Sequence, residues 1–206
     1  MIDTIVFDLG GVLIDLDMEV CKEHFISLLG YTKISELLDP CHQRGIYSDL
    51  EEGILSPDAF RAEVLKDSRP GCTPADVDRC MYSFLTGMDP DKAALLNELG
   101  SRYRLCLLTN NNDISMGRSH DVLESCGVDW KHLFYREFVS SHMKLLKPDP
   151  RIYNSMLAQL GTEASRILFV DDSVENVEVA RSLGINALHY QVGTSLRKLV
   201  EGVLEG

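Results

Sequence analysis

The sequence predicts an α/β protein with three layers around a parallel sheet, together with an inserted helical cap. Short runs of consecutive apolar residues indicate strands that are buried on both faces, as parallel strands are. Helical patterns lie between these runs, and such alternation of strands and helices is typical of a parallel α/β domain. One long segment, from about residue 16 to 86, shows helical patterns and no convincing strand.

Three segments fit a buried strand, and each ends abruptly in polar residues. They are residues 4–7 before Asp8, residues 105–108 before Thr109-Asn110, and residues 167–170 before Asp171-Asp172. Residues 185–188, directly after Gly184, are predicted as a fourth strand.

Helix starts are marked by a capping side chain followed by proline, which is favoured at the first helical position. Such pairs occur at Ser56-Pro57, Thr73-Pro74, Asp89-Pro90 and Asp149-Pro150. The helix after Pro150 is expected to end at Gly161. A further helix is predicted to begin at Asp172 or Ser173 and to end at Gly184.

The helical segment defines the predicted domain organisation. Residues 16–86 are expected to form the cap, and residues 1–15 together with 87–206 the α/β core. Its apolar stripes include Met18, Cys21, Phe25 and Leu28. Because the insertion directly follows the first strand, it should cover the end of that strand, with hinges near residues 13–17 and 86–90.

Composition and charge exclude several classes of protein. The 206 residues include 20 Lys and Arg against 32 Asp and Glu, a formal net charge of -12. That excess of acid argues against binding to nucleic acid or to anionic lipid, both of which require a basic surface. No apolar run reaches the ~18 residues of a membrane-spanning helix, and the start of the chain lacks the pattern of a secretory signal.

The cysteines show neither a CxxC pair nor the spacing of a zinc finger, so they are expected to be small buried residues in a reducing compartment. We therefore expect a cytoplasmic protein. The cysteines are Cys21, Cys41, Cys72, Cys80, Cys106 and Cys126.

Four polar clusters are predicted to share one edge of the sheet, because ligands bind beyond the carboxyl ends of parallel strands. Each has a simpler explanation by itself: a turn, a helix cap or a solvated lysine. Together they combine carboxylates, a hydroxyl and a cation at one place. The clusters are Asp8-Leu9-Gly10-Gly11, Thr109-Asn110, Lys147-Pro148-Asp149-Pro150 and Asp171-Asp172-Ser173.

The order of these motifs resembles the haloacid dehalogenase-like (HAD) hydrolase superfamily, in the branch that carries a helical cap after the first strand. The resemblance covers nearly the whole chain and implies a Rossmann-like core. Openings of the form DLGNV or DLGGV are similar to those of sugar-phosphate phosphatases in that branch. The motifs are FDLGGVL at 7–13, LLTN at 107–110, KPDPRIY at 147–153 and VDDSVENVEVARSLG at 170–184.

The resemblance implies a nucleophile and a metal. Asp8 would attack phosphorus to give an aspartyl-phosphate, which water then hydrolyses. Mg²⁺ would be held by Asp8, by the main-chain carbonyl of Gly10 and by Asp172, and would neutralise charge between two anionic reactants.

The resemblance also implies a phosphate-binding set. Thr109, Asn110 and Lys147 would bind the substrate phosphate, with Thr109 and Lys147 holding the transferring oxygens. Asp171 would support the metal or Lys147 from outside. Asn176 is expected only to orient a loop, a role that Asn110 would share.

Gly10 departs from the pattern of most phosphatases in the superfamily, which carry a second Asp at this position. That Asp usually protonates the leaving oxygen and then activates water, and glycine cannot do either. Asp15, Asp17 or the cap residue His24 are the substitutes that the sequence suggests. Other polar cap residues that could face a substrate are Arg44, His42, Tyr47 and Glu52, and the sequence singles out none as a site residue.

The leading hypothesis is a Mg²⁺-dependent phosphatase acting on a small phosphorylated metabolite, with a sugar phosphate as the best guess. One alternative is a metal-independent 2-haloacid dehalogenase that uses Asp8. Another is a catalytically impaired protein that binds or senses a phosphate ligand, for which Gly10 is the only support. The sequence does not determine the oligomeric state.

Overall fold

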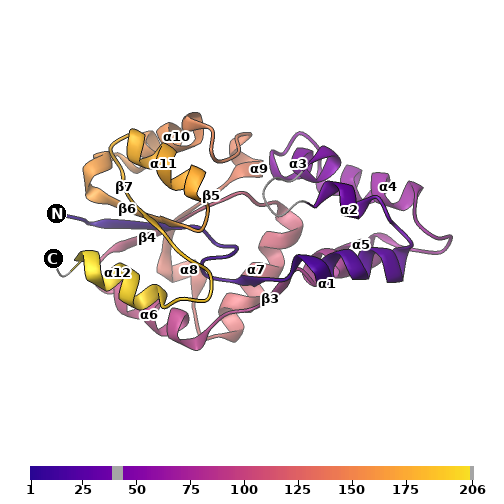
Figure 1. The fold of residues 1–206 in the computed structure, drawn as a ribbon, viewed down its shortest axis with the longest axis horizontal. Coiled ribbons are helices and arrows are strands. Elements are labelled where there is room, and N and C mark those ends of the chain that lie inside the picture. The colour runs from indigo at the N-terminus through magenta and orange to yellow at the C-terminus, as the bar shows by residue number, and fades with distance from the viewer. Residues whose placement is uncertain (39–43, 205–206) are drawn as a thin grey trace.

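The computed structural model describes residues 1–38 and 44–204 and is organised around a five-stranded parallel sheet with the order β5-β4-β1-β6-β7 (Figure 1). β1 lies at the centre, paired with β4 on one side and β6 on the other. The carboxyl ends of these three strands therefore lie side by side. The strands are β1 (Thr4–Phe7), β4 (Arg104–Thr109), β5 (Phe134–Val139), β6 (Ile167–Asp171) and β7 (Asn186–His189).

The four strands expected from the sequence are confirmed, and β5 is an addition. β5 pairs only with β4, so it is an edge strand of the sheet. Its residues Tyr135 and Arg136 are exposed and Glu137 is half-buried. An edge strand of this kind lacks the continuous apolar run that identifies a central parallel strand.

Helices cover both faces of the sheet, as the three-layer prediction requires (Figure 1). Alternate residues of the strands point to opposite faces: Ile5 and Phe7 join one apolar cluster, whereas Val6 joins the other. The first cluster is covered by α6 (Pro90–Gly100), α7 (Asp113–Ser125) and α12 (Leu196–Leu204), and the second by α10 (Pro150–Leu160) and α11 (Val174–Ser182). Short turns complete the core: α8 (Trp130–Leu133), α9 (Ser140–Met143) and the 3₁₀ turn η2 (Ala164–Arg166).

The expected helix starts and stops are confirmed. Proline occupies the first turn of each of the four helices expected to begin with it. Ser173 caps α11 by accepting a hydrogen bond from the Asn176 amide. Gly161 ends α10 in the left-handed conformation that glycine adopts without strain.

The insertion is helical and enters and leaves through a short antiparallel pair of strands. The pair is β2 (Asp15–Leu16) and β3 (Leu85–Gly87), which are too short to leave a pattern in the sequence. The insertion forms a separate apolar cluster, which Ile114 of α7 also joins, and extends to one side of the core (Figure 1). Its helices are α1 (Met18–His24), the π-helical turn η1 (Phe25–Leu29), α2 (Ile34–Leu37), α3 (Gly45–Glu51), α4 (Pro57–Lys66) and α5 (Pro74–Tyr82).

One expected core position in the insertion is wrong. The helical spacing predicts Leu28 on the same inward stripe as Phe25, but Leu28 is 45% exposed and Leu29 is buried instead. The reason is the π-helical turn η1, because its wider turn moves the inward position one residue further along the chain.

The cysteine prediction is confirmed only in part. Cys21, Cys80 and Cys106 are free and buried, whereas Cys72 and Cys126 are free and partly exposed. Cys41 lies outside the described residues. Among the helices of residues 1–38 and 44–204, none combines the length and the apolar character needed to cross a bilayer.

Candidate active site

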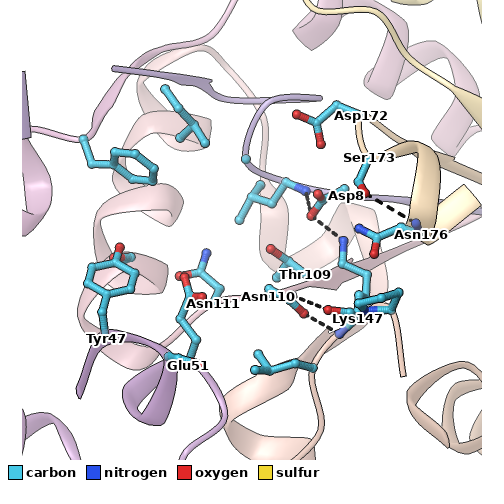
Figure 2. Close-up of a pocket in the computed structure, with 18 of the residues that line it drawn as sticks. Asp8, Tyr47, Glu51, Thr109, Asn110, Asn111, Lys147, Asp172, Ser173 and Asn176 are labelled. Carbon is cyan, nitrogen blue, oxygen red and sulfur yellow. Dashed lines mark hydrogen bonds and ion pairs between the residues drawn. The ribbon is translucent and has the colours of Figure 1, made fainter. Parts of the chain in front are cut away.

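A cavity of about 600 Å³ lies where β1, β4 and β6 end, and residues of the insertion form its opposite wall. From the core it is lined by Asp8, Gly10, Thr109, Asn110, Lys147 and Asp172, all of them residues that the sequence singled out. The insertion contributes a second set, which includes Leu16, Met18, Tyr47, Ser48 and Glu51. The structure thus brings the four predicted clusters together (Figure 2).

Asp8 directly follows β1 and is buried. Its Oδ1 accepts a hydrogen bond from the Leu9 amide at 2.7 Å and lies 3.0 Å from Nζ of Lys147. No described residue hydrogen-bonds to Oδ2, so this oxygen is available for a ligand or a reaction. Burial raises the pKa of Asp8 and the Lys147 cation opposes that rise.

Lys147 is a buried cation rather than a solvated surface lysine. Its side chain is 1% exposed, and Nζ lies 2.6 Å from Oδ2 of Asp171 and donates to the Leu108 carbonyl at 3.0 Å. Burial alone would lower the pKa of Lys147, but the charges of Asp171 and Asp8 outweigh that effect and raise it. Lys147 therefore stays positive beside the Asp8 carboxylate.

The two adjacent aspartates have different environments. Asp171 is fully buried, and its Oδ1 accepts hydrogen bonds from the Ser173 amide at 2.8 Å and from Nδ2 of Asn176 at 2.9 Å. With Oδ2 held by Lys147, both oxygens of Asp171 are occupied, which suits a supporting role. Asp172 is half-buried and lines the cavity, and its carboxylate has no hydrogen-bond partner among the described residues.

The carboxylates form a group that could hold a metal ion. Oxygens of Asp8, Asp171 and Asp172 all lie within 4.8 Å of one another. Like charges at this separation raise the pKa of Asp172, after the larger effect of burial. Hard oxygen donors around a partly open cavity fit Mg²⁺, which binds carboxylates while it keeps several waters.

Gly11 makes room for the Asp172 carboxylate. Its φ is +78°, and a Cβ added there would lie 2.2 Å from Oδ2 of Asp172. The second glycine of the opening motif is thus required both by the backbone conformation and by the close approach of a candidate metal ligand.

Gly11→Ala is therefore expected to weaken Mg²⁺ binding and any metal-dependent turnover by at least about tenfold, as a displaced ligand or its support does in metal sites. Titration with Mg²⁺ followed by calorimetry measures the first effect. Gly127→Ala is the matched control, because Gly127 has a φ of +80° but open space at its Cβ position. Equal Mg²⁺ affinity in the two variants would contradict the role of Gly11.

Thr109 and Asn110 end β4 in different ways. Thr109 is 2% exposed and faces the cavity. Asn110 uses its amide to hold the loop before α10: Nδ2 donates to the Lys147 carbonyl at 2.9 Å, and Oδ1 accepts from the Lys147 amide at 2.8 Å. Asn110 thereby positions Lys147, which favours the orienting role over direct contact with substrate.

The suggested substitutes for the missing second Asp do not line the cavity. Asp15 forms an ion pair with Lys92 at 2.8 Å, and Asp17 caps α1 by accepting a hydrogen bond from the Val20 amide. His24 lies on α1, also away from the cavity lining. Next to Gly10, Cδ1 of Leu16 lies 2.9 Å from the position that a Cβ would take.

Sequence reasoning missed Glu51, which reaches the cavity from α3 and is only 8% exposed. A signal existed: Tyr47, Leu50 and Glu51 share one helical face, and a carboxylate on an apolar face is unusual. Of the other polar residues proposed for the cap, Tyr47 lines the cavity, Arg44 and Glu52 do not, and His42 lies outside the described residues.

The chain is similar to known proteins over nearly its whole length. The family model described as haloacid dehalogenase-like hydrolase matches residues 2–184. A protein named D-ribitol-5-phosphate phosphatase from Bacteroides thetaiotaomicron is 30% identical over 205 residues, covering 99% of each chain.

Two solved structures of HAD family proteins share the fold of this chain. A HAD family enzyme from Bacteroides thetaiotaomicron, in complex with magnesium and inorganic phosphate, superposes with a TM-score of 0.86 at 29% identity, covering 97% of this chain and 99% of that one. A predicted HAD-like family hydrolase from Porphyromonas gingivalis gives a TM-score of 0.88 at 31% identity, covering 100% and 99% of the two chains.

Proposed function

Since the chain belongs to the haloacid dehalogenase-like hydrolase family, we propose that it is a Mg²⁺-dependent phosphatase that hydrolyses a small phosphate monoester through an aspartyl-phosphate. The observation that carries the proposal is the group formed by Asp8, Lys147, Asp171 and Asp172 at the end of β1 and β6. It combines a free carboxylate oxygen, a buried cation and a carboxylate set for a metal.

The proposed reaction has two steps. In the first, Oδ2 of Asp8 attacks phosphorus, the bond from phosphorus to the ester oxygen breaks, and the alcohol leaves. In the second, water attacks the same phosphorus and releases inorganic phosphate and the free Asp8 carboxylate. Lys147 keeps its positive charge beside Oδ1 of Asp8, which lowers the repulsion between the carboxylate and the anionic ester.

Asp8, the Gly10 carbonyl and Asp172 are the proposed Mg²⁺ ligands, with Asp171 as their support through Lys147. Bound Mg²⁺ would neutralise charge on the phosphate oxygens and orient them toward Asp8. Thr109, buried at the end of β4, is proposed to donate its hydroxyl hydrogen to one of those oxygens.

A sugar or polyol phosphate is the proposed substrate class. The full-length relative named D-ribitol-5-phosphate phosphatase supports it. The cavity also offers several polar side chains beyond the phosphate site, including Tyr47, Ser48, Asn111 and Ser115. Such groups can pair with substrate hydroxyls, and a substrate lacking those hydroxyls would leave them unpaired. We propose that residues 16–86 act as the cap that encloses the substrate.

The dehalogenase alternative gains no support from the site. That reaction needs no metal ion, whereas Asp8, Asp171 and Asp172 bring three carboxylates together and Lys147 forms ion pairs with only the first two. Carboxylates packed this closely are costly without further positive charge.

The proposal is tested by measuring phosphate release from a panel of sugar, polyol and nucleoside phosphates, with Mg²⁺ and with EDTA. Mg²⁺-dependent release from sugar or polyol phosphates is the expected result. A folded protein that binds Mg²⁺ but releases phosphate from no ester would contradict the proposal and favour a role in ligand binding.

A second test needs no substrate. Beryllium fluoride mimics the phosphoryl group on an aspartate, and a ligand that binds only the native state stabilises it by about 2.7 kcal/mol at 100 times its Kd. For a chain of this size we expect Mg²⁺ with beryllium fluoride to raise Tm by roughly 5–10 °C. Differential scanning fluorimetry measures the shift, with fluoride alone as control. No shift at saturation would contradict an intact aspartyl-phosphate site.

A further inference from the structure

We propose that Glu51, carried by the insertion, is the acid that protonates the leaving oxygen, the step for which Gly10 provides no side chain. The inference rests on the proposed phosphatase function and adds a catalytic residue to it. Glu51 lies on the cavity wall that faces Asp8 and does not belong to the core motifs (Figure 2).

The position of Glu51 is the first ground. It is the last residue of α3, it is 8% exposed, and it lines the same cavity as Asp8. Tyr47, one helical turn earlier, lies beside it on the cavity wall (Figure 2). No described residue forms a hydrogen bond with its carboxyl group, so both oxygens are available to a bound molecule.

The second ground is that the core holds this end of α3 in place. Oγ of Ser140, at the end of β5, donates to the Glu51 carbonyl at 2.6 Å and accepts a hydrogen bond from the Asn111 amide at 2.9 Å. Nζ of Lys144 donates to the Gly53 carbonyl just beyond the helix. These contacts fix the Glu51 backbone relative to β4 and β5, which is the pre-organisation that a catalytic group needs.

The geometry of the reaction is the third ground. Attack on phosphorus is in line, so the leaving oxygen is on the side of phosphorus away from Asp8. That side faces the wall of the insertion, where Glu51 lies. The Leu16 side chain occupies the space beside Gly10. Two further core carboxylates line the cavity, but Asp149 forms an ion pair with Arg151 and Glu175 is exposed.

The proton balance closes with Glu51 alone. In the first step the Glu51 carboxyl gives its proton to the ester oxygen as the bond to phosphorus breaks, and the neutral alcohol leaves. In the second step the Glu51 carboxylate takes a proton from the attacking water, whose oxygen bonds to phosphorus as Asp8 is released. Glu51 ends the cycle protonated again.

The electrostatics of the cavity agree with this role. Burial, and then the negative charge of Asp8, raise the pKa of Glu51 to about 8, while Lys147 opposes the rise. A carboxyl group in this range holds its proton at neutral pH, and a pKa near the working pH suits both donation and removal of a proton.

The test is the dependence on the leaving group in the full-length protein with Mg²⁺. p-Nitrophenyl phosphate has a leaving group that departs without protonation, whereas an alkyl phosphate requires an acid. Glu51→Gln is expected to lower kcat/KM by roughly 10²–10⁴-fold for the fastest alkyl phosphate of the panel, and by less than about tenfold for p-nitrophenyl phosphate. Glu52→Gln, next along the chain and outside the cavity lining, is the matched control and is expected to match the wild type.

The remaining outcomes separate the two proposals. An equal loss of kcat/KM for both esters in Glu51→Gln would assign Glu51 a structural role and overturn the inference alone. A higher KM with unchanged kcat for the alkyl ester would assign it to recognition and also overturn the inference. A folded wild type that hydrolyses neither ester would overturn the proposed phosphatase function, and the inference with it. Thermal denaturation checks folding, and the glutamine variant is expected to be at least as stable because it replaces a protonated acid by a neutral isostere.

Discussion

Asp8→Asn is expected to reduce phosphate release by at least about 10⁴-fold, because it removes the proposed nucleophile and with it the chemical step. Asparagine keeps the shape of the side chain and can still accept the Leu9 hydrogen bond through its oxygen. It loses the negative charge and the free oxygen that we propose as the nucleophile. The fold and the cavity should therefore be retained while the reaction is lost.

The measurement pairs steady-state turnover with a direct look for the intermediate. Wild-type protein mixed with ³²P-labelled ester and quenched in acid should carry label on the protein, and Asp8→Asn should carry none. Asp121→Asn is a suitable control, because Asp121 is exposed on α7 and lies outside the cavity lining. Label on the Asp8→Asn protein would show that another residue is the nucleophile.

The central part of the fold is readable from the sequence because its strands are buried on both faces. β1, β4 and β6 consist mainly of consecutive apolar residues followed by polar ones. This pattern predicts both the strand and the end of it at which the polar side chains gather. β5 is partly exposed at the sheet edge, so Tyr135 and Arg136 interrupt its apolar pattern. The π-helical turn that moves Leu28 outward depends on local backbone geometry, which a regular helical period does not reveal.

The candidate site is predictable only for residues that the strand ends bring together. Asp8, Thr109 and Asp172 follow strands whose order in a parallel sheet places them at one edge. Glu51 comes from a helix of the insertion, and its distance from that edge depends on how the insertion packs on the core. Contacts such as Ser140 to the Glu51 carbonyl decide this packing, and they join residues 89 positions apart.

Because Lys147 is buried, its removal is expected to lower the stability of the fold as well as turnover. Its Nζ is the positive group that lies against both Asp8 and Asp171, and all three side chains are shielded from solvent. Removing one partner from a buried ionic group leaves uncompensated charge, which costs about 3–5 kcal/mol. The same change removes a cation from the proposed phosphate site, for which we expect a loss on the order of 10²–10³-fold in kcat.

Lys147→Met isolates the effect of the charge, because methionine keeps much of the side-chain volume and removes only the charge and its hydrogen bonds. We expect Tm to fall by roughly 6–20 °C at neutral pH in the absence of Mg²⁺. Saturating Mg²⁺ should recover part of the loss, since a cation bound by Asp8 and Asp172 restores positive charge to the same carboxylates.

Lys198→Met is the control, because Lys198 is exposed on α12 and its removal should leave Tm and turnover unchanged. If Lys147→Met melted like the wild type without Mg²⁺, the charge of Lys147 would not be what holds the carboxylates together. Wild-type turnover in the same variant would also contradict the proposed phosphate-binding role of Lys147.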